Sequence, residues 1–244
     1  MPLPSDDARH DLAHSYAPLK LSSGWQCLST PAGAYATPES LDVYTNWIDA
    51  PVPGTIASAH RANGVGFDAL AQPFALADHW YRASLNAKGK RRLRFTGLAT
   101  ITEVWLDGVK LLDSDSMFIA HDVDIDLNSE ATLFLCFRSI APALTAKRGR
   151  ARWRPKLAQP ATLRNVRTTL LGHMPGWYLP IQPAGPWRDI EWIGESLKNI
   201  ERTDMHTRVE NGDGVLDFTV RFFHAQEPIS LRLECGDASI ELAW

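Results

Sequence analysis

The chain has 244 residues, enough for one large domain and part of a second at roughly 100–200 residues per domain. Its 25 Lys and Arg against 28 Asp and Glu leave a formal net charge of −3, which disfavours a general polyanion-binding protein because phosphate neutralisation needs surplus cations. Hydrophobic residues make up 45% and charged residues 22%, values of a folded globular protein that exclude extensive disorder.

The N-terminal segment 1–20 is rich in charged residues and lacks the apolar stretch of a signal peptide. No window approaches the roughly 18 apolar residues of a membrane span, so no membrane partner is expected. The three cysteines, Cys27, Cys136 and Cys235, lie far apart and show no metal-ligand spacing. We therefore expect reduced thiols, no metal site, no cofactor and a cytoplasmic location.

Alternating polar and apolar residues dominate the chain before Gly194 and predict β-strands. Asp107-Gly108 follows one such run and predicts a hairpin turn, because both residues tolerate the positive φ of a two-residue turn. The run 132–137 is more continuously apolar, which is typical of a strand covered on both faces. The predicted strands of this part are 92–96, 101–106, 121–127, 132–137 and 188–193.

The same alternation predicts which side chains are buried. Four apolar side chains are expected to bury one sheet face: Leu93, Phe95, Val104 and Leu106. Trp105 is also expected to be buried, on the same sheet as Phe95. Three acidic side chains of one strand are expected to face solvent: Asp122, Asp124 and Asp126. Helical signal is confined to one or two turns within 54–70, so the fold class is an all-β sandwich.

A second group of strands begins after Gly194, at 199–209, 216–222, 229–233 and 240–244, with a turn at 211–214. These four strands are too few to enclose a sandwich core of their own. They therefore predict the opening half of a second β-domain. We divide the chain into an N-terminal extension (1–19), a sandwich domain (20–197) and this partial domain (198–244). The chain is accordingly expected to be a piece of a longer protein.

Six short motifs stand in a fixed order along the chain: Val52–Ile56, Trp80–Arg82, Leu93–Gly108, Ser116–Phe118, Arg164–Arg167 and Pro183–Arg188. This order resembles the N-terminal sugar-binding domain of glycoside hydrolase family 2, in its β-mannosidase-like branch. The resemblance implies a jelly-roll sandwich of the galactose-binding-domain type, followed by an immunoglobulin-like sandwich and a TIM barrel. It also implies that the parent protein hydrolyses a β-glycoside with two carboxylates carried on the barrel.

This chain offers no convincing carboxylate pair of its own. A retaining glycosidase places its two carboxyl groups ~5–5.5 Å apart, flanking the scissile bond. The acidic clusters here are 113–115 and 122–126, and the second alternates along a strand so that its carboxylates share a solvated face. We therefore assign no catalytic residue. The expected partners are carbohydrate, bound weakly, and the C-terminal glycosidase domains; no feature sets an oligomeric state.

In the resembled family, a Gly-Trp-Asp-Trp-Gly loop holds the terminal sugar through its Trp-Asp pair. With Arg167 and Ala184–Arg188 as anchors, the first Trp falls on Pro175, the Asp on Gly176 and the second Trp on Trp177. The sugar-gripping carboxylate is therefore missing. The remaining candidate carbohydrate contacts are Trp177, Tyr178 and Arg167. The alternative is that this loop is an anchor that packs on the sandwich rim or against another domain.

Two further functions stay open. The first is a stand-alone carbohydrate-binding module. The second is a protein or nucleic-acid interaction module that uses the basic segment 147–156, where six cations accompany Trp153. The net negative charge argues against nucleic acid as a partner.

Overall fold

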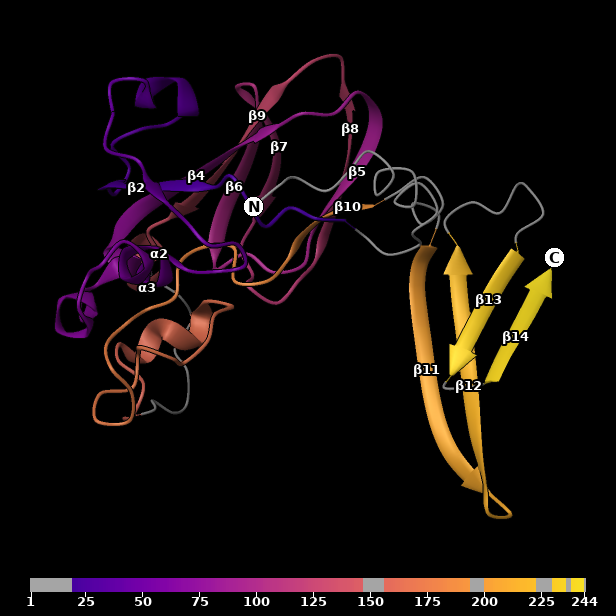
Figure 1. The fold of residues 1–244 in the computed structure, drawn as a ribbon. Coiled ribbons are helices and arrows are strands. Elements are labelled where there is room, and N and C mark those ends of the chain that lie inside the picture. Colours follow the sequence, from indigo (N-terminus) through magenta and orange to yellow (C-terminus); the bar gives the residue numbers. More distant parts are fainter. Residues whose placement is uncertain (1–18, 147–155, 194–199, 223–229, 236–237, 244) are drawn as a thin grey trace. The chain divides into compact units, whose positions relative to one another are not determined.

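Two antiparallel β-sheets face each other in the first part of the chain, as the computed structural model shows (Figure 1). The structure describes residues 19–146, 156–193, 200–222, 230–235 and 238–243. Leu19–Trp192 forms one compact unit, and the strands after Ile193 belong to another. The all-β class is confirmed.

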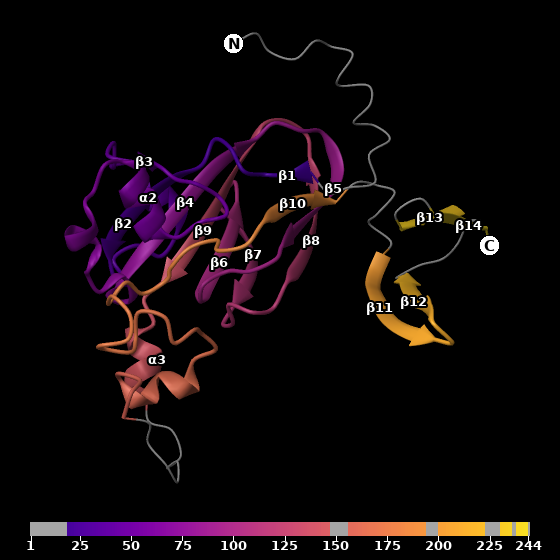
Figure 2. The same cartoon turned by 60° about the horizontal axis from the view of Figure 1, so that its bottom comes forward.

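The larger sheet has six strands in the order β3-β2-β4-β9-β6-β7, and the smaller has four in the order β1-β10-β5-β8 (Figure 2). The strands of the larger sheet are β2 (Gln26–Pro31), β3 (Ile48–Asp49), β4 (Ala77–Leu85), β6 (Ile101–Leu106), β7 (Val109–Ser114) and β9 (Ala131–Arg138). Those of the smaller are β1 (Leu19–Lys20), β5 (Gly89–Phe95), β8 (His121–Leu127) and β10 (Ile190–Ile193). Every strand predicted in this part is present.

The main core lies between the two sheets and corrects one prediction. Leu93 and Phe95 enter it from β5 of the smaller sheet, whereas Val104 and Leu106 enter it from β6 of the larger sheet. The four side chains therefore belong to two facing surfaces, not to one sheet face. Alternation identifies the buried side of a strand, but it does not tell which sheet the strand joins.

Trp105 is buried, as predicted, but its sheet and its surroundings were predicted wrongly. It lies on β6, in the other sheet from Phe95, with 9% of its surface exposed. Its neighbour Val104 points into the main core, so alternation along β6 turns Trp105 to the outer face of the larger sheet. There it stands opposite Phe134 of β9.

A second apolar cluster explains why that outer face is buried. Side chains from β2, β4 and β9 pack against the segment that leads from β2 to β3, including the 3₁₀ helix η2 (Pro38–Leu41). The cluster comprises Leu28, Leu41, Trp80 and Cys136, with Tyr35, Tyr44, Trp47 and Phe134 at its margin. The larger sheet is therefore covered on both sides.

The acidic face of β8 was predicted correctly. Asp122 and Asp124 form bidentate pairs with Arg94 and Arg92 of the neighbouring β5, with the shortest N–O distance 2.7 Å in each pair. Asp126 is also exposed. These carboxylates stabilise a sheet surface by cross-strand pairing, and they form no acid–nucleophile arrangement.

Helical structure is short, as the sequence indicates. α2 (Ile56–Ala62) begins with a capping box in which the Thr55 hydroxyl accepts from the Ser58 amide, and η3 (Phe67–Leu70) follows it. Besides η2, three further short helices lie outside the predicted window: η4 (Phe74–Leu76), α3 (Ala141–Thr145) and η5 (Ala161–Asn165). Positions 147–155, which make up most of the basic segment 147–156, lie outside the described residues.

The second unit consists of two hairpins: β11 (Ile200–Glu210) with β12 (Asp213–Phe222), and β13 (Ser230–Cys235) with β14 (Ala238–Ala243). Asn211 and Gly212 form the first turn with φ of 53° and 93°, so it is shorter than the predicted 211–214. The hairpins leave Met205, Val209 and Ile240 more than half exposed.

Cys27 and Cys136 are buried free thiols, as expected, and burial raises the pKa of Cys27 to about 12. The Cys235 side chain lies outside the described residues. None of the described helices is long and apolar enough to cross a membrane.

Candidate functional site

The motifs that are far apart in sequence meet at one end of the sandwich. The Ala99 and Gly185 backbones exchange two hydrogen bonds of 3.0 and 3.1 Å, and the Gly54 amide donates to the Pro186 carbonyl at 2.8 Å. A Cβ on Gly185 would lie 2.8 Å from the Tyr81 hydroxyl oxygen and 2.9 Å from the Gly54 carbonyl oxygen. Only glycine fits this junction of four chain segments.

The Ser116–Phe118 motif fastens the same end. The Met117 amide donates to the Arg167 carbonyl at 3.0 Å, and the Met117 carbonyl accepts from the Trp187 indole N–H at 2.8 Å. The backbone of Arg167 therefore holds the segment in place while its side chain is exposed. Figures 1 and 2 both show η5 and the segment that follows it beyond this end of the sandwich, beside α3, before the chain returns along the sandwich to β10.

Trp177 and Tyr178 lie on a tight turn within that segment. Both of their amides donate to the Met174 carbonyl, at 3.1 and 3.3 Å. Gly176 has a φ of +82°, and open space surrounds the position that a side chain would occupy there. The Trp177 side chain is 67% exposed and the Tyr178 side chain 51%. The turn thus presents two aromatic side chains to solvent, and Gly176 beside them carries no carboxylate.

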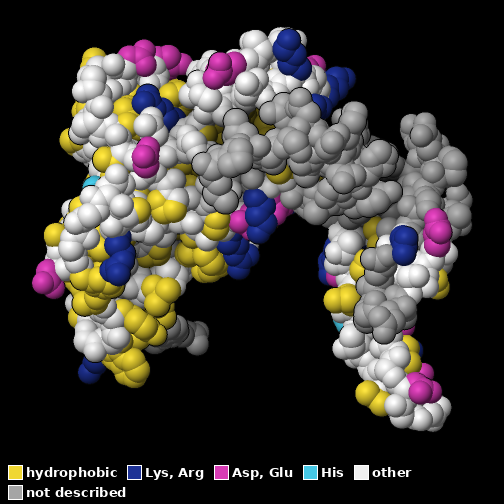
Figure 3. Space-filling model, viewed as in Figure 1, with side chains coloured by type: hydrophobic (Ala, Val, Ile, Leu, Met, Phe, Trp, Pro, Cys, Tyr) yellow, Lys and Arg dark blue, Asp and Glu magenta, His cyan; other side chains and the backbone are white. Residues whose placement is uncertain are grey.

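These aromatics belong to a larger exposed apolar surface, which we name the 157–179 patch. Each of its members is at least half exposed: Leu157, Leu170, Leu171, Trp177, Tyr178 and Leu179. Figure 3 shows hydrophobic side chains gathered over this part of the chain. Clusters of large exposed apolar side chains mark contact surfaces for ligands or other proteins.

The structure brings together two of the three candidate residues. Trp177 and Tyr178 are neighbours on the turn, whereas the Arg167 guanidinium makes no cation–π contact with Trp177 in the described part of the chain. His173 is buried behind the turn, where its carbonyl accepts from the Gln159 amide at 2.8 Å. Burial lowers the pKa of His173. No group of three His, Cys, Asp or Glu side chains suited to a metal ion occurs among the described residues.

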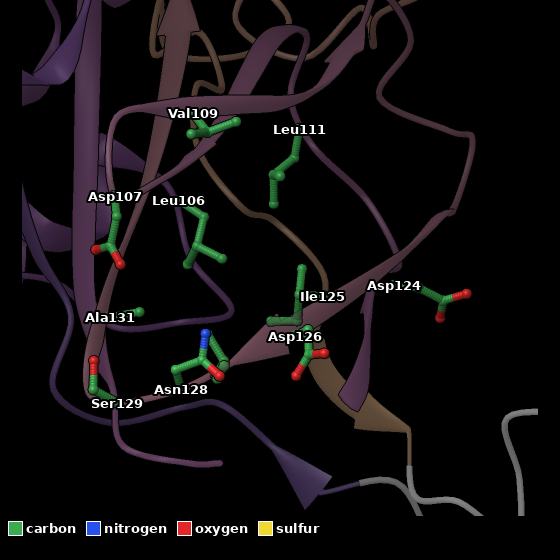
Figure 4. A pocket seen from close by; sticks show the side chains of 11 residues that line it. Leu106, Asp107, Val109, Leu111, Asp124, Ile125, Asp126, Asn128, Ser129 and Ala131 are labelled. Atoms are coloured by element: carbon green, nitrogen blue, oxygen red, sulfur yellow. The ribbon is translucent and has the colours of Figure 1, made fainter. Parts of the chain in front are cut away.

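Two pockets, which sequence reasoning did not reveal, lie along the open edge of the sandwich between β7 and β8. The first has a volume of about 390 Å³, and Figure 4 shows Val109 and Leu111 of β7 facing Ile125 of β8 across it. Its mouth carries Asp107 and Asn128, and the Asp107 carboxylate accepts from the Thr132 amide at 2.7 Å. The second pocket has a volume of about 310 Å³ and lies near the Ser116–Phe118 motif, where Thr102 of β6, Ser114 of β7 and His121 of β8 line it.

Comparison with protein families decides the classification. Residues 28–188 match the family described as glycosyl hydrolase 2 galactose-binding domain-like. The chain belongs to this family.

The relatives of this glycosyl hydrolase 2 domain agree with the match. The chain is 28% identical over 216 residues to a β-mannosidase B of Aspergillus flavus, covering 80% of this chain and 24% of that protein. It is 34% identical over 108 residues to a β-mannosidase B of Emericella nidulans, covering 37% of this chain and 13% of that protein. It therefore spans about a quarter or less of the curated relatives it matches.

Solved structures confirm the fold of the glycosyl hydrolase 2 domain. A β-D-mannosidase of Dictyoglomus thermophilum superimposes with a TM-score of 0.68 at 17% identity, over 93% of this chain and 29% of that one. A β-glucuronidase of Lactobacillus rhamnosus superimposes with a TM-score of 0.55 at 15% identity, over 99% of this chain and 38% of that one. The resemblance inferred from the motif order is confirmed.

Proposed function

We propose that this chain is the non-catalytic N-terminal portion of a β-mannosidase-like glycosidase, whose chemistry resides in domains outside the chain. The names of its curated relatives support the β-mannosidase assignment. The strands after Ile193 would then open an immunoglobulin-like sandwich that precedes a catalytic barrel. We also propose a cytoplasmic location, which the free buried thiols of Cys27 and Cys136 support.

The 157–179 patch is the observation that carries this proposal. A single sugar ring stacks on one aromatic face, but this surface adds four exposed leucines to Trp177 and Tyr178. Apolar surface of this kind is stabilised by burial against another protein surface, at roughly 25 cal/mol per Å². We therefore assign the patch to docking of the catalytic domains, with Trp177 and Tyr178 at the margin where a sugar contacts the loop.

A stand-alone carbohydrate-binding module is the second candidate, because the exposed Trp177 ring alone suits stacking on a sugar. The leucines of the patch favour the docking assignment over this one. The nucleic-acid alternative rests on the basic segment 147–156, of which only Lys156 lies among the described residues.

Sugar binding at the Trp177 turn is expected to be weak and poorly selective. Gly176 supplies no carboxylate to accept from a pair of sugar hydroxyls, an interaction worth roughly 1.5–3 kcal/mol. Titration of mannose and of glucose, followed by tryptophan fluorescence and amide chemical shifts, should give dissociation constants in the millimolar range (about −4 kcal/mol) at this turn. Trp177→Ala should abolish the amide chemical-shift changes at residues 173–178.

Phe67→Ala is the matched control, because Phe67 is also an exposed aromatic residue, 52% exposed, but lies on η3. It should leave the titration unchanged. Micromolar, mannose-selective binding that disappears in Trp177→Ala would show that another group replaces the missing carboxylate, and this account of the turn would be wrong.

A further inference from the structure

Two Asn-Gly pairs occur in the chain, at Asn63-Gly64 and Asn211-Gly212. Such a pair can react with itself, because the amide nitrogen of the glycine can attack the side-chain carboxamide carbon of the asparagine. The absent Cβ of glycine lets the two groups approach each other. All of these residues are exposed, so exposure does not distinguish the two pairs, whereas their hydrogen bonds do.

The structure restrains both reacting groups at the first pair. Asn63 is the C-cap of α2, and its Nδ2 donates to the carbonyls of Asp49 and Ala59, at 2.8 Å in each case. The Gly64 amide, which would be the nucleophile, donates to the Arg61 carbonyl at 3.0 Å. Reaction at this pair therefore requires these hydrogen bonds to break first.

The second pair lacks such restraints. Asn211 and Gly212 form the two-residue turn between β11 and β12, with φ of 53° and 93°. Among the described residues, neither the Asn211 carboxamide nor the Gly212 amide has a hydrogen-bond partner. The position that a Cβ would take on Gly212 is surrounded by open space. Reaction at this pair therefore requires only a local rotation within the turn.

We propose that Asn211 is a site of spontaneous deamidation in the folded chain, and that Asn63 is protected from the same reaction. The Gly212 nitrogen loses its proton to solvent base and forms a bond to Cγ of Asn211, and ammonia leaves. The product is a cyclic succinimide. Water then opens the ring at either of its carbonyl carbons, which gives aspartate or isoaspartate at position 211. In total, the reaction consumes one water and releases one ammonia.

Either product alters the tip of the hairpin. Both add a negative charge beside Glu210 and Asp213, which stand opposite each other next to the turn, and like charges at this separation are destabilising. Isoaspartate also lengthens the main chain of a turn whose length sets the register of the two strands. Deamidation should therefore loosen β11 and β12 from the turn inward and leave the unit Leu19–Trp192 unchanged.

The test incubates the folded 244-residue chain at mildly alkaline pH and follows both pairs by peptide mass spectrometry, which detects the replacement of –NH₂ by –OH. Asn211 should react at least about tenfold faster than Asn63, because the hydrogen bonds at Asn63-Gly64 raise the barrier there. Amide chemical shifts should change at 209–214 and stay unchanged at 19–192. Equal rates at the two pairs, or a faster reaction at Asn63, would overturn the proposal.

Two controls separate the effect of the structure from that of the local sequence. In the urea-unfolded chain the two pairs should react at similar rates, because no hydrogen bond then protects Asn63. If Asn211 stayed as much faster in urea, the neighbouring residues would set the difference and the proposal would be wrong. Asn211→Gly keeps a turn that accepts positive φ but removes the carboxamide, so it should abolish the changes at 209–214. Changes that persist in this variant would contradict the proposed effect on the hairpin.

Discussion

Arg138→Ala is expected to lower the free energy of unfolding of the sandwich by about 3–5 kcal/mol, because it leaves a buried carboxylate without its counter-ion. Asp78 has a side chain only 2% exposed, and its Oδ2 accepts from the Arg138 guanidinium at 2.9 Å. The same guanidinium donates to Glu103 at 2.6 Å and to the Tyr35 carbonyl at 2.7 Å. One substitution therefore removes the ion-pair partner of two carboxylates and a hydrogen-bond donor to the segment that covers the outer face of the larger sheet. Asp78 would keep only the hydrogen bonds from the Gly33 and Ser139 amides.

Chemical denaturation followed by near-ultraviolet circular dichroism measures this effect, since the Arg138 guanidinium lies over the Trp80 ring at 5.0 Å. Lys110→Ala is the matched control: its partner Asp113 is 64% exposed, so the loss should stay below about 1 kcal/mol. Arg138→Lys should recover part of the stability, because it keeps the charge but not the planar fork. Equal losses in Arg138→Ala and Lys110→Ala would contradict the assignment of Arg138 as the central ion of this network.

The sandwich is expected to lose about 3 kcal/mol of stability between pH 6.5 and pH 4 through His79 alone. Burial lowers the pKa of His79 to about 4. The neutral ring is fixed by two hydrogen bonds, since Nε2 donates to the Phe74 carbonyl at 2.8 Å and Nδ1 accepts from the Ser29 hydroxyl at 2.9 Å. Protonation of Nδ1 would remove its capacity to accept.

The direction of the pH effect follows from which state binds the proton. Between the unfolded pKa of roughly 6.5 and the folded value, the unfolded chain binds more protons than the folded chain. Stability is therefore fully present above about pH 6.5, falls as the pH falls, and the contribution is gone below about pH 4. Burial also lowers the pKa values of His60, His121 and His173, which adds to the effect in the same direction.

His79→Gln should flatten the pH dependence of the unfolding free energy across this window, because glutamine does not titrate. His206→Gln is the control, since His206 is an exposed residue of β11 in the second unit. Unfolding curves collected from pH 7 to pH 4 give the comparison. A His79→Gln profile parallel to that of the unsubstituted chain would show that His79 is not the titrating group.

The sequence predicts local structure here better than the assembly of that structure. The turn after β6 was predicted from Asp107-Gly108, and the structure gives these residues φ of 45° and 80°. The predicted bounds of β8 match the observed ones because polar and apolar residues alternate throughout 121–127. The pairing of β5 with β8 and of β6 with β9 was not predictable, because alternation is the same whichever sheet a strand joins.

In the candidate sites, too, the sequence predicts local positions better than it predicts which surfaces come together. The position of the Trp177 turn followed from its distance to Arg167 and Ala184, because both anchors are fixed by backbone hydrogen bonds to other motifs. The exposure of the surrounding leucines depends on which surfaces cover them, which spacing does not encode. The pocket beside the Ser116–Phe118 motif was not predictable, since its lining comes from β6, β7 and β8, and alternation does not tell which strands lie side by side.

The most direct test of the central claim is a hydrolysis assay of the 244-residue chain on nitrophenyl β-glycosides of mannose, galactose, glucose and glucuronic acid. The account predicts no turnover, because the described carboxylates of 113–126 form solvent-facing ion pairs or stand alone, with no acid–nucleophile pair across a sugar site. Turnover that survives repurification and is abolished by Asp→Asn substitution at Asp113, Asp115 or Asp122 would contradict it.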